Sequence, residues 1–286
     1  MNVHYRWIIA AALLAGICGC GRSVVSDPPP DEDLAIAIRN AQSGDADGSA
    51  ETAAAEPAVT EWGSLTGRFV FDGQAPTPSP LSITKDVPVC GRHNLVDESL
   101  VVGPDGGLAN VVVFVNTRSV PVHPDYEATA NEKVMFDNEH CRFEPHILAL
   151  RTSQTLVVHN SDPVSHNSNL APLGDTSINP LLSEKGAAEH QFKRSQSAPV
   201  PVTCSIHPWM KGYVFPRGNP YVAVTDDQGS FTIENLPAGE LEFQVWQERS
   251  GPLAAKPQWK RGRFKFKIEP GDNDLGEIQV SPDLLN

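Results

Sequence analysis

The sequence has no apolar run long enough to cross a lipid bilayer as a helix. The run from Trp7 to Ile17, in MNVHYRWIIAAALLAGICGCG, has eleven residues and follows Arg6, whereas a membrane-spanning helix needs about 20. A short apolar run behind a basic residue is typical of a secretory signal. We therefore predict a signal peptide over residues 1–20 and export of the protein to the periplasm or cell envelope.

The end of this run also resembles a bacterial lipobox. In ICGC an aliphatic residue is followed by a small one, then by Gly19 and Cys20. Cleavage before Cys20 would leave that cysteine to carry lipid, so a lipid-anchored protein is expected. Cys18 fits less well because bulky Ile17 would occupy the cleavage position. The alternative is an ordinary signal peptide with two incidental cysteines.

Positive charge is also scarce, with 22 Lys and Arg against 35 Asp and Glu and a net charge of −13. This balance argues against nucleic acid as a partner, while it permits docking to a basic protein. Residues 21–60 hold eight of the acids against two bases and are rich in Pro, Ala, Ser and Gly. Such a segment buries too little apolar surface to fold, so we predict an acidic, disordered tether.

Residues 61–286 show no sustained helical periodicity. Short apolar or alternating runs separated by turn signals predict strands instead. Only 181–190, LLSEKGAAEH, could hold a short helix. The strands are expected at SLTGRFVF (64–71), NVVVFVN (110–116), HILAL (146–150), TLVVHN (155–160), VPVTC (200–204) and several later runs. This pattern predicts an all-β protein built as a sandwich or barrel.

The last quarter resembles the carboxypeptidase-regulatory-like β-sandwich module. The match in YVAVTDDQGSFTIENLPAGELEFQVW is carried by Thr225, Asp226, Gly229, Phe231, Leu236, Pro237, Gly239 and Val245, with Leu241 at a usually aromatic position. We therefore predict one domain over 61–217 and a smaller β module over 218–286. Alternatively, GSLTGRFVFDGQAP (63–76) is an early strand of that same module.

Cysteine is scarce as well, and outside the signal region the count is odd. Cys90, Cys141 and Cys204 allow three pairings, each of which leaves one cysteine out. An exported protein is expected to pair its thiols, so an unpaired one needs a reason. If Cys204 binds a metal, Cys90 and Cys141 are free to form a disulfide.

Two stretches bring metal-binding side chains together. TCSIHPWMKGYVF (203–215) holds Cys204, His207 and Met210, and HNSDPVSHN (159–167) offers His166. A thiolate and two imidazoles with a weak axial thioether form the ligand set of a blue-copper electron-transfer centre. Zinc could use two His and one Cys, and a buried Cys and Met could also be incidental packing. The methionine favours copper over zinc.

At these residues the chain resembles the cupredoxins, or blue copper proteins. Its Cys-x-x-His-x-x-Met loop has the compact spacing of amicyanin, including Pro208 after the histidine, although Ser205-Ile206 departs from that loop. The surrounding sequence is similar to exported bacterial proteins of the methylamine-utilisation type. The resemblance covers roughly residues 110–217 and, more loosely, 62–250.

This resemblance implies a Greek-key β-sandwich that holds one type 1 copper. His166, Cys204 and His207 would be the equatorial ligands and Met210 the axial one. Asn167 would hydrogen-bond across to the cysteine loop and hold it in place.

Two further residues near the motif have alternative interpretations. His146 is either an extra ligand or, as we expect, a structural hydrogen-bonding group. Trp209 is either a core residue or, with Pro208, part of an apolar patch where a redox partner docks.

The resulting functional prediction is an extracytoplasmic one-electron carrier that exchanges with a c-type cytochrome or a dehydrogenase. A copper-binding or delivery lipoprotein without redox turnover and a structural cell-surface β-sandwich are the alternatives. Only three methionines are present, whereas a delivery protein more often has open Met or His clusters. An enzyme is not expected because no carboxylate pair, nucleophile elbow, phosphate loop or second histidine cluster is evident.

Overall fold

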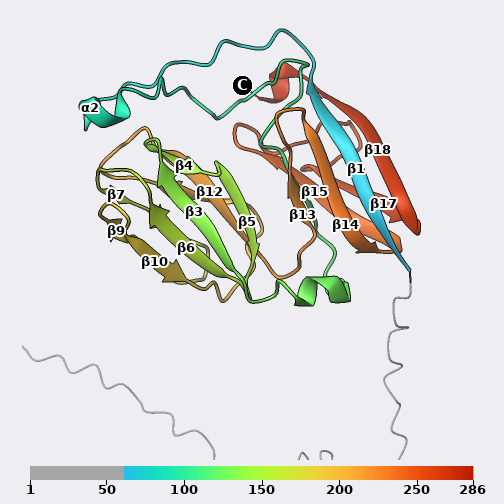
Figure 1. Ribbon diagram of the computed structural model, residues 1–286. Helices are drawn as coiled ribbons and strands as arrows, with labels where there is room; N and C mark the ends of the chain where they lie inside the picture. The colour runs from blue at the N-terminus through green and yellow to red at the C-terminus, as the bar shows by residue number, and fades with distance from the viewer. Residues whose placement is uncertain (1–60, 286) are drawn as a thin grey trace, which may run out of the picture. The chain divides into compact units, whose positions relative to one another are not determined.

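The computed structural model describes residues 61–285, which form short β-strands joined by turns (Figure 1). Helical structure among them is limited to α2 (Val87–Cys90) and the 3-10 turns η1 (Pro124–Glu127) and η2 (Pro282–Leu284). The predicted all-β class is confirmed. Within this part of the chain no helix has the length and apolar character needed to cross a membrane. The predicted signal peptide, Cys20 and the tether lie outside the described residues.

One group of strands comes from residues 133–217. Its first sheet has the order β10-β6-β3-β4 and its second β5-β12-β11-β8, and β7 pairs with β9. The strands are β3 (Lys133–Glu139), β4 (Arg142–Glu144), β5 (Ile147–Arg151), β6 (Thr155–Asn160), β7 (His166–Asn167), β8 (Asn169–Leu170), β9 (Leu181–Leu182), β10 (Ala187–His190), β11 (Val200–Thr203) and β12 (Lys211–Arg217). Side chains of both sheets, such as Phe136, Leu156, Val202 and Val214, form one buried cluster. Each large apolar side chain buried there contributes about 1.5–3 kcal/mol.

A second group combines the first strands with the last ones. Its sheets are β14-β1-β18 and β13-β2-β15-β16, and β17 also pairs with β15. These strands are β1 (Trp62–Phe71), β2 (Val112–Val115), β13 (Val222–Val224), β14 (Ser230–Pro237), β15 (Gly239–Gln247), β16 (Gly251–Pro252), β17 (Arg263–Ile268) and β18 (Gly271–Val280). Phe69, Val113, Phe231, Phe243 and Ile278 are among the residues of its buried core.

The strand pairing does not follow the predicted division at residue 217. β1 pairs with β14 and β18, and β2 pairs with β13 and β15, although both strands precede 217. The alternative assignment of 63–76 to the C-terminal module agrees with this pairing. Period-two alternation shows that a segment is a strand, but it does not identify the strand that pairs with it.

The short helix that residues 181–190 could have held does not form. Leu181–Leu182 and Ala187–His190 are β9 and β10, and Gly186 lies in the turn between them. A glycine in the middle of so short a segment costs helical stability, and β10 gains ladder hydrogen bonds to β6 instead.

A third buried cluster lies between the two groups. It contains Val112 and Phe114 of β2, Tyr213 and Phe215 of β12, and Trp246 of β15. The two groups of strands therefore share apolar surface.

Arg217, at the end of β12, also joins the two groups. It is only 8% exposed. Its guanidinium donates to the Val115 and Gln196 carbonyls at 2.7 Å each, and it lies over the Phe114 and Phe215 rings. Burial lowers the pKa of Arg217 to about 10, so the side chain stays charged at neutral pH.

Candidate metal centre

The hairpin between β11 and β12 carries most of the candidate ligands. Cys204 directly follows β11, and Met210 directly precedes β12, so the two strands fix both ends of the loop. Inside the loop, Met210 N donates to His207 O at 2.9 Å and Cys204 N to Met210 O at 3.4 Å. The fourth residue, His166, comes from the neighbouring β7. A short turn between paired strands thus holds residues that sequence spacing alone only suggested were close.

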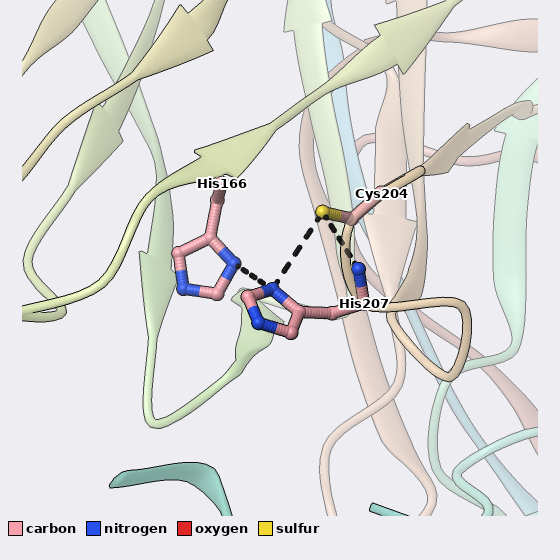
Figure 2. A group of neighbouring side chains, drawn as sticks. All are labelled: His166, Cys204 and His207. Carbon is pink, nitrogen blue, oxygen red and sulfur yellow. Dashed lines mark hydrogen bonds between the residues drawn. The ribbon is translucent and has the colours of Figure 1, made fainter. Parts of the chain in front are cut away.

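Three donor atoms converge at this point (Figure 2). The Nδ1 atoms of His166 and His207 lie 2.9 Å apart, and Cys204 Sγ lies 3.9 Å from His207 Nδ1. The three ligand atoms all lie within 4.8 Å of one another. His166 and His207 are 0% exposed and Cys204 2%, so bulk water is excluded from the group.

Met210 lies close to this group along the chain. It is 1% exposed and belongs to the same buried cluster as Cys204. The structure therefore places all four predicted ligand residues in the interior at one end of the 133–217 strands.

Each histidine is held from its other side by a carboxylate. His166 Nε2 lies 2.9 Å from Asp162 Oδ2, and His207 Nε2 lies 2.9 Å from Asp86 Oδ2. Because an ionised carboxylate only accepts hydrogen bonds, both Nε2 atoms carry the proton. The Nδ1 atoms therefore face each other and the thiol, and in the metal-free protein the 2.9 Å contact between them requires a proton on one of the two rings.

Neither carboxylate was predicted from the sequence. Asp162 lies in NSDP, one of the turn signals between the predicted strands, and its position four residues before His166 was a weak signal. Asp86 is 121 residues from His207 and precedes α2 in the segment between β1 and β2. No local pattern connects it to the ligand loop.

Asn167 connects the two ligand segments. Its Oδ1 accepts from Ser205 N at 2.8 Å and from Ile206 N at 3.3 Å, and lies 3.4 Å from Cys204 Sγ. Its own backbone N–H approaches the same sulfur at 3.5 Å. These contacts hold the first turn of the cysteine loop against β7.

The surroundings favour the charged thiolate. Burial by itself raises the pKa of Cys204, but hydrogen bonds from His166, His207 and the backbone N–H groups outweigh it and lower this pKa from 9.0 to about 5. For His166, burial acts to lower the pKa, and the bonds to Asp162 and Cys204 raise it overall. A thiolate at neutral pH beside two imidazoles is a soft donor set, which fits copper.

The other two cysteines among residues 61–285 form a disulfide. Cys90, at the end of α2, is bonded to Cys141, in the turn between β3 and β4. Cys141 lies near Asp162 and His166, but its sulfur is already bonded. Among the residues that the structure describes, Cys204 is the one free cysteine.

His146 lies outside the three-residue group. Its Nε2 is 2.7 Å from Glu248 Oε2, and its Nδ1 is 3.8 Å from Glu98 Oε2. Lys211 also reaches Glu248, at 2.8 Å. These residues form a charged hydrogen-bonding network beside the loop.

Trp209 contacts both the ligand group and the surface. Its ring centroid lies 5.0 Å from that of His207, and its Nε1 donates to Cys141 O at 3.2 Å. With Pro208 it lines a pocket of about 450 Å³. The side chain is therefore partly core and partly pocket wall.

Comparison with known proteins gives similarity only over part of the chain. A copper-containing nitrite reductase from Thermus scotoductus matches with 21% identity and a TM-score of 0.27, over 29% of this chain and 22% of its own length. A purple cupredoxin from Nitrosopumilus maritimus matches with 24% identity and a TM-score of 0.25, over 30% of this chain and 99% of its own. A Cu(I) form of an amicyanin variant matches with 17% identity and a TM-score of 0.27, over 37% and 98%. No protein-family model and no curated protein matches the sequence.

Proposed function

We propose that this protein binds one copper ion at His166, Cys204, His207 and Met210 and acts as an extracytoplasmic one-electron carrier. The observation that carries the proposal is the convergence of two imidazole Nδ1 atoms and one low-pKa thiol in a group sealed from water. Bound copper would supply a single electron by alternating between its Cu(I) and Cu(II) states.

The chain's own residues supply a rigid donor set. Asp162 and Asp86 fix the orientation of the imidazoles, and Asn167 holds the thiol-bearing turn through two backbone N–H groups. Donors that cannot move between oxidation states keep the geometry nearly constant when an electron is transferred. Exclusion of water protects the thiolate from oxidation and blocks additional ligands.

We infer a carrier rather than an enzyme, because the ligand group is buried without an open position toward a substrate. The expected partner is a redox protein such as a c-type cytochrome or a dehydrogenase, with the protein tethered to the cell envelope through Cys20. The Pro208 and Trp209 wall of the pocket gives an electron a short protein path to His207, through the ring contact.

Optical and EPR spectroscopy of the full chain after addition of Cu(II) tests this function. We expect an intense thiolate-to-copper absorption band with narrow copper hyperfine splitting. Cys204→Ser should abolish both, and Met210→Leu should shift them. Met135→Leu is a matched control because Met135 is 52% exposed on β3. Copper bound without the band, or bound equally by Cys204→Ser, would exclude the carrier site.

Electrochemistry distinguishes the carrier from a delivery protein. A carrier should pass repeatedly between Cu(II) and Cu(I) without loss of metal. A delivery protein should release Cu(I) to a soluble chelator on reduction. Preference for Zn(II) over copper in a competition would instead support the zinc alternative.

A further inference from the structure

We propose that Asp86 is a positioning residue for His207, and that the Cys90–Cys141 disulfide holds it in place. The inference rests on the proposed function in that the positioned imidazole is a copper ligand. It assigns a role to the segment between β1 and β2, which supplies no ligand of its own.

The first observation is that Asp86 shields His207 from solvent. Its imidazole is 0% exposed, yet the Asp86 side chain that meets its Nε2 is 42% exposed. Asp86 therefore lies between the imidazole and solvent. Without this carboxylate, the edge of His207 opposite the thiol would have no hydrogen-bond acceptor among the described residues.

The second observation is that Asp86 is held in an unfavourable backbone conformation. Its φ of 45° and ψ of 37° lie in the left-handed region, which residues other than glycine seldom adopt. The carbonyl of Asp86 accepts from Val89 N at 2.8 Å and from Cys90 N at 2.9 Å. One turn of chain thus links the carboxylate rigidly to the disulfide.

The third observation is that the disulfide connects both carboxylates. On the other side of the bond, Cys141 N donates to Asp162 Oδ2 at 2.8 Å, and His140 N donates to Asp162 Oδ1 at 2.8 Å. Asp162 then holds His166. A closed series of contacts therefore links the two histidines. His207 contacts Asp86, which the disulfide connects to Asp162. Asp162 contacts His166, and the Nδ1 atom of His166 lies beside that of His207.

This series of contacts has a chemical consequence for His207 as a ligand. A carboxylate that accepts from Nε2–H makes the imidazole a stronger donor at Nδ1 and fixes its orientation. A stronger donor stabilises Cu(II) relative to Cu(I), so Asp86 should lower the reduction potential of the centre. The disulfide should act in the same direction by keeping Asp86 in register.

Asp86→Asn tests the positioning role, with Asp125→Asn as the matched control. Asp125 is also an aspartate beside a histidine, at 3.5 Å from His123 Nδ1, but it is 75% exposed. Two readouts are measured: the reduction potential of the copper protein, and the exchange of the His207 Nε2–H with water by ¹⁵N NMR of the metal-free protein. We expect Asp86→Asn to favour Cu(I) over Cu(II) by about tenfold, equivalent to about 59 mV for one electron.

The exchange of the His207 Nε2–H should be at least about tenfold faster in Asp86→Asn, and both readouts should be unchanged in Asp125→Asn. Reduction of the disulfide in the folded metal-free protein by a phosphine, which becomes a phosphine oxide while two thiols form, should accelerate the same exchange. The Cys90→Ser/Cys141→Ser variant provides the same measurement without a reductant.

Unchanged exchange in Asp86→Asn would overturn the positioning role, and unchanged exchange after disulfide reduction would overturn the role of the disulfide. Because exchange is measured without metal, these outcomes stand even if the wild-type protein forms no blue copper centre. That last result would refute the proposed function alone.

Discussion

Cys204 combines deep burial with a low pKa, and this combination gives the metal-free protein a pH-dependent property. The folded-state pKa of about 5 lies below the value of 9.0 for an unperturbed thiol. A depressed pKa contributes stability that is fully present above the unfolded value and is lost as pH falls through the folded value. The stabilising contribution of Cys204 should therefore decline between pH 9 and pH 5.

Ultraviolet absorbance of the thiolate measures this directly. In the folded metal-free protein the absorbance should appear with a midpoint near pH 5, and in urea-unfolded protein near pH 9. Cys204→Ser should lack the folded-state transition near pH 5. A folded-state midpoint at or above that of the unfolded chain would contradict the arrangement of His166 and His207 around the thiol.

The ligand residues were accessible from the sequence because three of them lie within seven positions of one hairpin. His166 was found because a histidine followed by asparagine comes after a predicted strand and a turn. Asp86 and Asp162 were missed for a physical reason. Carboxylates are common on any surface, and only the fold and the disulfide bring these two against imidazoles.

At the scale of elements, the turn between β13 and β14 depends on a glycine at Gly229. Its φ is +75°, and a Cβ there would lie 2.1 Å from Phe69 O and 2.8 Å from Leu108 N. The TDDQG turn therefore packs directly against β1. This gives a steric reason for one of the glycines that carried the resemblance to the C-terminal module.

Gly229→Ala should lower the free energy of unfolding by clearly more than Gly276→Ala. Gly276 has a similar φ of +74° but nothing within 4 Å of a Cβ, so its replacement should cost only the backbone term of about 1–2 kcal/mol. Urea unfolding of both variants gives the comparison. Equal losses of unfolding free energy would show that the contact with β1 adds nothing to the cost of the substitution.

The positions of most strands followed from alternation and turn residues, but their pairing did not. β1 alternates like a half-buried strand and β2 is a continuous buried apolar run. Their partners are β13, β14, β15 and β18, more than a hundred residues away. Such pairings depend on which apolar faces fit together across the core. The proposed boundary at 217 was placed on local resemblance, which carries no such information.

At the scale of the whole molecule, the two groups of strands meet at Arg217 and the apolar cluster around it. Arg217→Met should leave the Val115 and Gln196 carbonyls without this donor, at a cost of about 1–3 kcal/mol in total. It should also separate the unfolding of the two groups, because Arg217 reaches across from β12 to β2. Differential scanning calorimetry should then show a broadened or split transition.

Arg118→Met is the matched control, since Arg118 is exposed and the structure gives it no ion pair in the described part of the chain. Its transition should remain like that of the wild type. A sharp, unshifted transition for Arg217→Met would mean that apolar contact alone holds the groups together.

The pairing of β1 with β18 also determines which part of the protein can fold first. β1 is the first described strand to leave the ribosome, and its parallel partner β18 is the last. The strands of residues 133–217 find all their partners within that range. The hairpin that carries Cys204 and His207 therefore needs no strand of the other group for its own pairing, so it can form while β1 and β18 are still unpaired.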